Sequence, residues 1–474
     1  VTIIPYRCFD GCTKLNRVSL GTSVTDIGEY SFRGCQALKA IRFPTSVKKI
    51  WSYAFSGLAN LESVQLNEGL EIIESAAFRE CTALQSILLP ATLKTMGSYV
   101  FNVCTQLRQI VIPNSVMSIG QCCFEDCSAL TTVTWGSSLK TVPYRTFNGC
   151  KRLVSVFLPE GVVDIGEYSF EGCQALREIR FPSSVKKIWS YVFSGLTNLE
   201  SVQLNEGLEI IESGAFRECT ALQSILLPTT LKTMGGSVFN ACTQLRQIVI
   251  PNSVTSIGQY CFEDCSALTT VTWSTSLATV PYKTFHGCKR LVQVSLPKGV
   301  TDIGEYSFYG CHALKVIELP STVKKIYGFA FYGLERLETI VLNSGLEVIE
   351  SNAFNGCELL DHVLIPNSVK TISGGAFANC ISLSSIVVPD SVSSLGSQVF
   401  YGCSSLTNAV FGSGMDYVPY KTFVRCSKLS QIEIRDGVLD IGEYAFDSCY
   451  ALTSVTFPPS MRKVCASAFN GLSN

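Results

Sequence analysis

The chain has 474 residues, and its 37 basic and 38 acidic side chains leave a formal net charge of −1 at pH 7. No block of like charge supplies the basic surface that binding to nucleic acid or to an anionic membrane requires. No apolar run approaches the roughly 18 residues of a membrane-spanning helix, and no signal peptide is visible. We therefore predict no nucleic-acid partner and no membrane span in this sequence.

One unit of constant length recurs along the whole sequence. Units begin at 21, 44, 67 and so on to 458 without insertion or deletion, which gives nineteen complete coils between the part-coils 1–20 and 458–474. A phenylalanine occupies the same position of every unit, from Phe9 to Phe469. Since one unit cannot bury its apolar side chains alone, successive coils must stack into a continuous core. The chain begins and ends inside a coil, so we expect any leader, terminal cap or anchor to lie outside it.

The unit 297–319 combines two hydrophobic periods. Four side chains have the spacing of one helix face, namely Ser307, Phe308, Cys311 and Leu314. The unit then ends with the alternation of a strand at Leu314, Ile317 and Leu319. This pattern predicts a short helical turn followed by a short strand in every coil.

The repeated pattern resembles a known family. L-x-x-I-x-L-P-x-S-V-x-x-I-G-x-x-A-F-x-x-C, seen at 383–403, is similar to the BspA-like, Treponema-type class of leucine-rich repeats, and the resemblance covers essentially all 474 residues. It implies a right-handed curved superhelix of about twenty coils of roughly 23 residues each, an α/β solenoid with a parallel β-sheet along one face and short helical turns on the other. It also implies a cell-surface or secreted protein that acts in adhesion.

A longer period groups the coils in sixes. We expect a single solenoid domain, 1–474, made of super-repeats 21–158, 159–296 and 297–434 and an incomplete fourth, 435–474. The first two super-repeats are nearly identical, which indicates a recent tandem duplication. Each surface feature is therefore a tile that returns six coils later.

Seventeen of the 22 cysteines occupy one position of the unit, where the other coils hold Leu58, Leu196, Leu334 and Leu472. A position that accepts leucine is apolar, so we interpret these cysteines as buried thiols. Disulfides between successive coils are an alternative, although the leucine coils would leave some cysteines without partners. Zinc is a further alternative, but one ligand per coil does not converge on one ion. We predict no metal and no cofactor.

Two kinds of tile are candidates for binding. Residues between the inward anchors of each strand should point outward, and the apolar ones among them are Leu88, Val111, Phe157, Leu226, Val249, Val341, Leu364, Val387 and Val410. The run from Val341 to Val410 places four of them on adjacent coils. The second tile, K-K-I-W-S-Y, contains Trp51 and Trp189, which could hold a sugar ring or an anionic polymer beside the lysines. Alternatively, these aromatic residues only cover a turn, with the lysines solvated.

No catalytic motif is present. The sequence has no G-x-S-x-G, H-E-x-x-H or G-x-x-x-x-G-K segment, and its three histidines occupy different unit positions. Carboxylates that return once per super-repeat, such as Asp26 and Asp164, are interpreted as capping or solvated residues of a turn. We predict a non-enzymatic binding and adhesion scaffold that presents its sheet face to a protein or glycan partner. The alternative is a structural element that self-assembles in a surface layer or cell wall.

Overall fold

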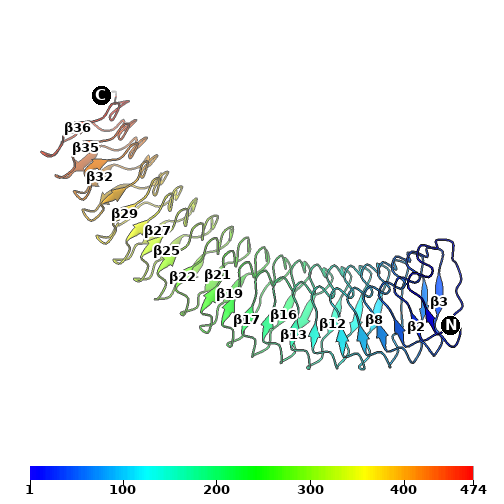
Figure 1. Ribbon diagram of the computed structural model, residues 1–474. Coiled ribbons are helices and arrows are strands. Elements are labelled where there is room, and N and C mark those ends of the chain that lie inside the picture. Colours follow the sequence, from blue (N-terminus) through cyan, green and yellow to red (C-terminus); the bar gives the residue numbers. More distant parts are fainter. Residues whose placement is uncertain (473–474) are drawn as a thin grey trace. The chain divides into compact units, whose positions relative to one another are not determined.

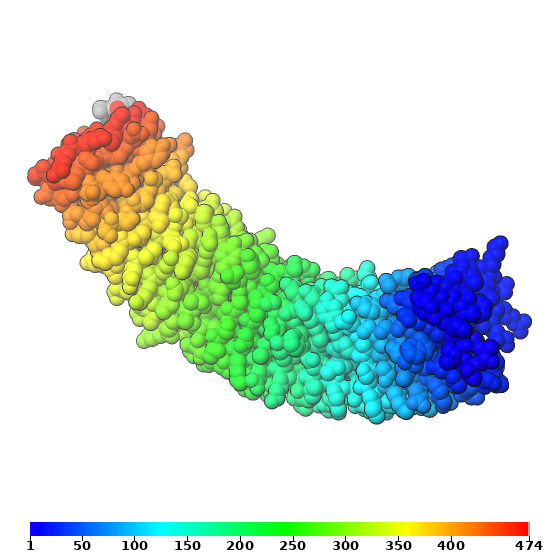
Figure 2. Space-filling model, viewed as in Figure 1, coloured from blue at the N-terminus to red at the C-terminus, as the bar shows by residue number. Residues whose placement is uncertain are grey.

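The computed structural model describes residues 1–472, which fall into two compact units. The first is Val1–Cys242 and the second is Thr243–Asn474. Within each unit the chain forms successive coils that follow one another in sequence order (Figure 1), and the bands of colour in Figure 2 show that each coil packs against the coils before and after it. The predicted parallel-strand solenoid of about twenty coils is confirmed. Its description as one continuous domain stays a prediction.

The first unit contains two kinds of strand. The longer strands are β3 (Ala40–Arg42), β5 (Ser63–Gln65), β8 (Gln109–Val111), β10 (Thr132–Thr134), β12 (Ser155–Phe157), β14 (Glu178–Arg180) and β16 (Ser201–Gln203). The shorter strands are β1 (Ile3–Ile4), β2 (Asp26–Ile27), β4 (Lys49–Ile50), β6 (Ile72–Ile73), β7 (Thr95–Met96), β9 (Ser118–Ile119), β11 (Thr141–Val142), β13 (Asp164–Ile165), β15 (Lys187–Ile188), β17 (Ile210–Ile211) and β18 (Thr233–Met234).

The second unit repeats this arrangement. Its longer strands are β19 (Gln247–Val249), β21 (Thr270–Thr272), β23 (Gln293–Ser295), β25 (Val316–Glu318), β27 (Thr339–Val341), β30 (Ser385–Val388), β32 (Asn408–Phe411) and β34 (Gln431–Ile434). Its shorter strands are β20 (Ser256–Ile257), β22 (Thr279–Val280), β24 (Asp302–Ile303), β26 (Lys325–Ile326), β28 (Val348–Ile349), β29 (Thr371–Ile372), β31 (Ser394–Leu395), β33 (Tyr417–Val418), β35 (Asp440–Ile441) and β36 (Lys463–Val464).

The strand pairs within each unit are parallel, and the two partners lie at equivalent positions of adjacent coils. In the longer strands, Ile110 of β8 faces Val133 of β10, and both side chains are buried while their neighbours on either side are exposed. In the shorter strands, Ile27 of β2 pairs with Ile50 of β4, again with both side chains buried. The sequence pattern predicted one ladder of strands, whereas most coils contribute to two, because the second pair of inward anchors also lies on extended backbone.

The predicted helical turns are wrong: among residues 1–472 the structure contains no helix. In the segment 28–35, the Ser31 N–H bonds to the carbonyl of Gly28, while the Phe32 N–H bonds to Ala54 of the next coil. Tyr30 and Gly34 adopt positive φ angles of 55° and 70°, and the corresponding pair of positions repeats in later coils. The two residues in the left-handed conformation lie four positions apart, and this conformation interrupts an α-helix. Every second N–H group of the segment therefore points toward the neighbouring coil.

The core is a set of stacked columns with one residue per coil. Phe55 and Phe78, for example, are fully buried and stack with ring centroids 5.4 Å apart and an angle of 7° between their planes. Columns of leucine and cysteine run beside the phenylalanine column. Each column buries its apolar side chains only against the adjacent coils, so the core is continuous along a unit but narrow across it.

Candidate binding surface

The outward positions of the longer strands are exposed, as predicted for most of the apolar residues found there. The exposed residues are Leu88, Val111, Phe157, Leu226, Val249, Val341, Leu364 and Val387, whereas Val410 is only partly exposed. For the residues that lie in strands, the geometry of a strand explains this placement, because alternate side chains point to opposite faces and the buried face is occupied by the core. The leucines at 88, 226 and 364 and the valines at 111, 249 and 387 each return at six-coil intervals.

The three leucines of this set lie where the longer ladder is interrupted. No strand forms at Leu88 or Leu226, and at the coil of Leu364 the pairing is reduced to single bridges that involve His362. The predicted strands at these positions are therefore wrong. Leu88, Leu226 and Leu364 are nevertheless the most exposed apolar side chains of the outer face, at 80%, 82% and 81%. Leucine side chains this exposed bury almost nothing within their own unit.

In the second unit, an apolar patch crosses four adjacent coils. Val341 ends β27, Leu364 follows on the next coil, and Val387 of β30 pairs in register with Val410 of β32. Val341 and Val387 are about half exposed, and Leu364 projects furthest. We call these four residues the valine-leucine patch. Contiguous exposed apolar side chains on a soluble protein commonly mark an interaction surface.

Phe157 lies beside a break of a different kind in the first unit. It ends β12, and among the described residues β12 and β14 form no ladder, although they belong to adjacent coils. A hollow of about 450 Å³ occupies the break, with Phe157, Arg177 and Phe181 among its lining residues. On one wall, Arg180 forms an ion pair with Glu178 at 2.7 Å. The hollow is therefore polar at its rim and apolar at Phe157.

Trp51 is held in place by three charged groups. Its ring centroid lies 3.5 Å from the Lys49 Nζ, and the same ammonium forms a 2.7 Å ion pair with Glu74 of the next coil. The indole Nε1 donates to the Asp26 carboxylate at 3.4 Å. The ring is 41% exposed. Of the two lysines, only Lys48 is exposed, so the interpretation that both lysines are solvated is wrong.

Trp189 has the same surroundings one super-repeat later. Lys187 Nζ lies 3.7 Å from its ring centroid and pairs with Glu212 at 2.7 Å, while the indole donates to Asp164. Asp26 and Asp164 lie in β2 and β13, so the interpretation of these carboxylates as turn residues is wrong. In both super-repeats a lysine ammonium already occupies one face of the tryptophan ring, so the tile is packed in the same way each time.

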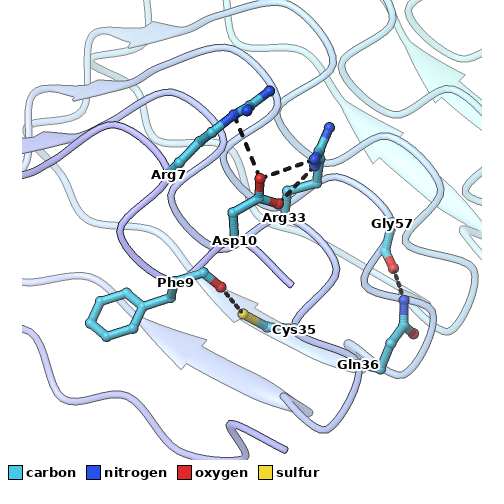
Figure 3. Close-up of polar contacts among 7 residues, drawn as sticks. All are labelled: Arg7, Phe9, Asp10, Arg33, Cys35, Gln36 and Gly57. Carbon is cyan, nitrogen blue, oxygen red and sulfur yellow. Dashed lines mark hydrogen bonds and ion pairs between the residues drawn. The ribbon is translucent and has the colours of Figure 1, made fainter. Parts of the chain in front are cut away.

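An ion cluster that the sequence reasoning missed connects the first two coils (Figure 3). The guanidinium of Arg33 donates to both carboxylate oxygens of Asp10, at 2.9 and 3.0 Å, and Arg7 Nε lies 3.6 Å from Asp10 Oδ2. Both guanidinium groups also lie over the ring of Tyr30, at 5.2 and 4.9 Å from its centroid. Asp10 and Arg33 are one repeat unit apart in the sequence, so they lie on the same side of adjacent coils. This spacing could have revealed the ion pair.

The cysteine column consists of free thiols, and nearly all of them are buried. Sγ of Cys35 donates to the carbonyl oxygen of Phe9, as Figure 3 shows, and the same contact recurs along both units at 3.1 to 3.3 Å. Burial raises the pKa of Cys104 to about 12. Within residues 1–472 no group of three or more His, Cys, Asp or Glu side chains is arranged to hold a metal ion. The thiols therefore pack the core.

No helical segment of residues 1–472 could cross a lipid bilayer. The model of the BspA type leucine-rich repeat region matches the chain six times, at residues 2–131, 118–246, 164–292, 233–361, 278–407 and 347–474. No curated protein matches the chain.

Three solved structures illustrate the likeness. A leucine-rich repeat protein from Bacteroides ovatus is 29% identical, with a TM-score of 0.57 over 78% of this chain and 83% of its own. The leucine-rich repeat protein of T. pallidum is 36% identical over 32% of this chain and 72% of its own, with a TM-score of 0.32. A leucine-rich cell surface protein from Faecalibacterium prausnitzii is 20% identical over 88% of this chain and 92% of its own, with a TM-score of 0.32. Since the family model spans nearly every coil, the chain belongs to the family of BspA-type leucine-rich repeat proteins.

Proposed function

We propose that this protein is a non-enzymatic binding and adhesion scaffold of the cell surface, and that it presents the outer face of its longer strands to a protein partner. The observation that carries the proposal is the valine-leucine patch of the second unit. Aliphatic side chains on four adjacent coils offer contact area and no hydrogen bonds, which suits an apolar surface of another protein better than the hydroxyl groups of a glycan. A glycan partner is the alternative outcome.

The regularity of the coils supports a scaffold and not an enzyme. An active site needs acid, base or nucleophilic groups that converge in a pocket. Here every coil has the same length, and the carboxylates that recur, such as Asp26 and Asp164, are engaged with neighbouring side chains. The family model that the chain matches describes a leucine-rich repeat region, which is the architecture of a scaffold. The proposed location agrees with the description of the Faecalibacterium prausnitzii protein as a cell surface protein.

The test replaces the three exposed members of the patch together, as Val341→Ser, Leu364→Ser and Val387→Ser. Wild type and variant are applied to an array of extracellular-matrix proteins and glycans. We expect the variant to lose at least tenfold in affinity for every protein that the wild type captures, because buried apolar anchors carry most of the energy of an interface. Binding unchanged by the three substitutions would exclude this face.

A matched control uses apolar side chains that are exposed on the turn side of the same coils. Leu359 is 48% exposed and Ile381 is 41% exposed, so Leu359→Ser with Ile381→Ser removes exposed apolar area from the same coils without touching the outer face of the longer strands. This control should bind as the wild type does. Equal circular dichroism spectra for all three proteins would show that the coils remain folded.

A structural role is the second candidate, and one observation favours it. Leu88, Leu226 and Leu364 are exposed to the same extent at intervals of one super-repeat, a periodicity that would suit lateral association of identical chains. Multi-angle light scattering separates the two functions. A monomer at every concentration would contradict self-assembly, whereas growing oligomers that disappear on Leu→Ser substitution at the three sites would support it.

A further inference from the structure

A hollow lined by aromatic rings lies on the turn segments of the second unit, away from the residues of the proposed partner surface. It has a volume of about 490 Å³. Two columns of rings form its walls. The first wall consists of Tyr282, Tyr306 and Phe329, and the second consists of His286, Tyr309 and Tyr332. All six side chains are partly exposed. We call this feature the aromatic trough.

The rings of the second wall stack on one another from coil to coil. His286 and Tyr309 have centroids 5.0 Å apart, and Tyr309 and Tyr332 have centroids 5.4 Å apart, with planes within 13° of parallel in both pairs. On the first wall, Tyr306 and Phe329 stack at 4.7 Å. The walls meet at an angle, since the planes of Tyr306 and Tyr309 differ by 67°. Stacking covers the ring faces between the coils of the second wall, so that wall presents mainly ring edges, whereas Tyr282 meets Tyr306 edge to face with an angle of 87° between their planes.

The second wall is specific to the third super-repeat and the coil before it. Near the start of the chain, the positions of His286, Tyr309 and Tyr332 are occupied by Asp10, Arg33 and Ser56, and one super-repeat later by Asn148, Glu171 and Ser194. The same coil geometry therefore forms with polar side chains at these positions. Three aromatic side chains are not needed for folding there, so their accumulation on a partly exposed surface points to a ligand.

The trough offers groups that can donate hydrogen bonds. Tyr306, Tyr309 and Tyr332 line the hollow, and each phenol can donate an O–H to a ligand as well as accept one. The ammonium of Lys283 lies 5.5 Å from the ring centroid of Tyr282 and 5.8 Å from that of Tyr306. Aromatic edges also carry partial positive charge. A complementary ligand combines apolar surface with carbonyl acceptors.

We propose that the aromatic trough binds a proline-rich peptide segment in the polyproline II conformation. Such a segment has free carbonyl acceptors and apolar rings, and its prolines lack the N–H donor. Aromatic-lined grooves recognise this conformation because it is already extended and little entropy is lost on binding. A sugar is a poorer match, since in the second wall the ring faces on which a pyranose would stack are covered by the neighbouring rings.

The dimensions of the trough agree with this ligand. The second wall crosses three coils, and the centroids of its successive rings are 5.0 and 5.4 Å apart. A polyproline II helix rises about 3.1 Å per residue, so one turn of three residues spans roughly 9 Å and fits that length. The contact is short, and we expect a dissociation constant in the range of about 10 to 100 μM, typical of a small groove that recognises one turn.

The test uses the full chain and a fluorescein-labelled peptide of ten prolines, followed by fluorescence anisotropy. The variant Tyr309→Glu with Tyr332→Ser installs the residues found at the equivalent positions 171 and 194, so the fold already accommodates them. We expect this variant to bind the decaproline peptide at least tenfold more weakly than the wild type. A Gly-Ser peptide of equal length and a linear glucose pentasaccharide, each labelled in the same way, should not bind the wild type.

A reciprocal variant tests whether the trough is sufficient. Asn148→His, Glu171→Tyr and Ser194→Tyr rebuild the second wall in the second super-repeat and the coil before it, where Tyr144 and Tyr168 already stand at the positions of Tyr282 and Tyr306. Introduced into Tyr309→Glu with Tyr332→Ser, they should restore binding of decaproline to within about threefold of the wild type. This gain cannot come from a general loss of stability.

Three results would overturn the proposal. They are no binding of decaproline to the wild type, equal binding to the Tyr309→Glu, Tyr332→Ser variant, and binding of the pentasaccharide in place of the peptide. The patch variant Val341→Ser, Leu364→Ser, Val387→Ser should bind decaproline as the wild type does, because its substitutions lie on the strand face. The proposal for the trough and the proposal for the partner surface can therefore be rejected independently of each other.

Discussion

Sγ of Cys35 lies 3.2 Å from the carbonyl oxygen of Phe9, which also accepts the backbone N–H of Cys12 at 3.1 Å. One carbonyl thus receives a donor from its own coil and a thiol donor from the next. The same double contact recurs at later coils, for example where the carbonyl of Phe101 accepts from Cys104 and Cys127. Cysteine fits this position because it combines the size of a small apolar side chain with a weak donor.

Thiol accessibility should divide the cysteines into two groups. Cys8 and Cys12 are exposed, whereas Cys104 is buried and its pKa is raised to about 12. At pH 8 only about one in ten thousand of such thiols is ionised, and alkylating reagents react with the thiolate. We expect iodoacetamide to label Cys8 and Cys12 within minutes and Cys104 only after unfolding. Mass spectrometry of timed samples checks this, and rapid labelling of Cys104 in the native protein would contradict the buried column.

The thiol column should also make the fold sensitive to alkali. Burial holds the folded pKa of Cys104 at about 12 and that of Cys35 at about 11, above the ordinary thiol value of 9.0. The folded chain therefore keeps protons that the unfolded chain loses. This contribution to stability is complete below pH 9 and is lost progressively as the pH rises toward 12.

Thermal unfolding at pH 7, 9, 10 and 11 checks that prediction. We expect similar melting temperatures at pH 7 and 9 and a steep decrease above pH 9, with thiolate absorbance in the far ultraviolet rising together with unfolding. If thiolate absorbance at pH 9 rises by more than the exposed Cys8 and Cys12 can supply while the circular dichroism signal stays native, the column is open to solvent.

Truncation of the phenylalanine column should be costly. Phe124 is fully buried and stacks on Phe101 at 5.7 Å and on Phe147 at 5.6 Å. Phe124→Ala leaves a cavity between adjacent coils, and we expect a loss of about 3–5 kcal/mol in the free energy of unfolding. Hydrogen exchange should accelerate mostly in the coils next to residue 124, since stability in a repeat protein depends on nearest neighbours. A loss below about 1 kcal/mol would mean that the column closes around the missing ring.

A glycine substitution should stabilise the turn at Ala241. This residue has a φ of 57°, in the left-handed region that is unfavourable for residues with a Cβ atom. The equivalent position of another coil is Gly195, with a φ of 73°. We expect Ala241→Gly to raise the free energy of unfolding by about 0.5–1 kcal/mol, measured by urea denaturation. Ala37→Gly, at a residue without a positive φ, should lower it by a similar amount; stabilisation by both changes would count against the left-handed turn.

The constant repeat length by itself determined the solenoid, the stacked phenylalanine and cysteine columns and the outward direction of residues such as Leu88 and Val387. Period and residue type suffice for these features because every coil has the same length, so residues one period apart must lie on adjacent coils at the same place. The exposed side chains of the strand face follow from the same rule, since alternation in a strand separates the two faces.

Only the tertiary structure decided where the backbone hydrogen bonds go. The apolar spacing around Phe308 matches a helix, yet the Phe308 N–H bonds to Ala330 of the next coil. Turn bonds within a coil and bonds between coils can satisfy the same amide groups, and their competition depends on contacts that a single unit does not contain. The aromatic trough has the same origin: Tyr309 and Tyr332 are simply one period apart in the sequence, and they become one wall only when their coils stack.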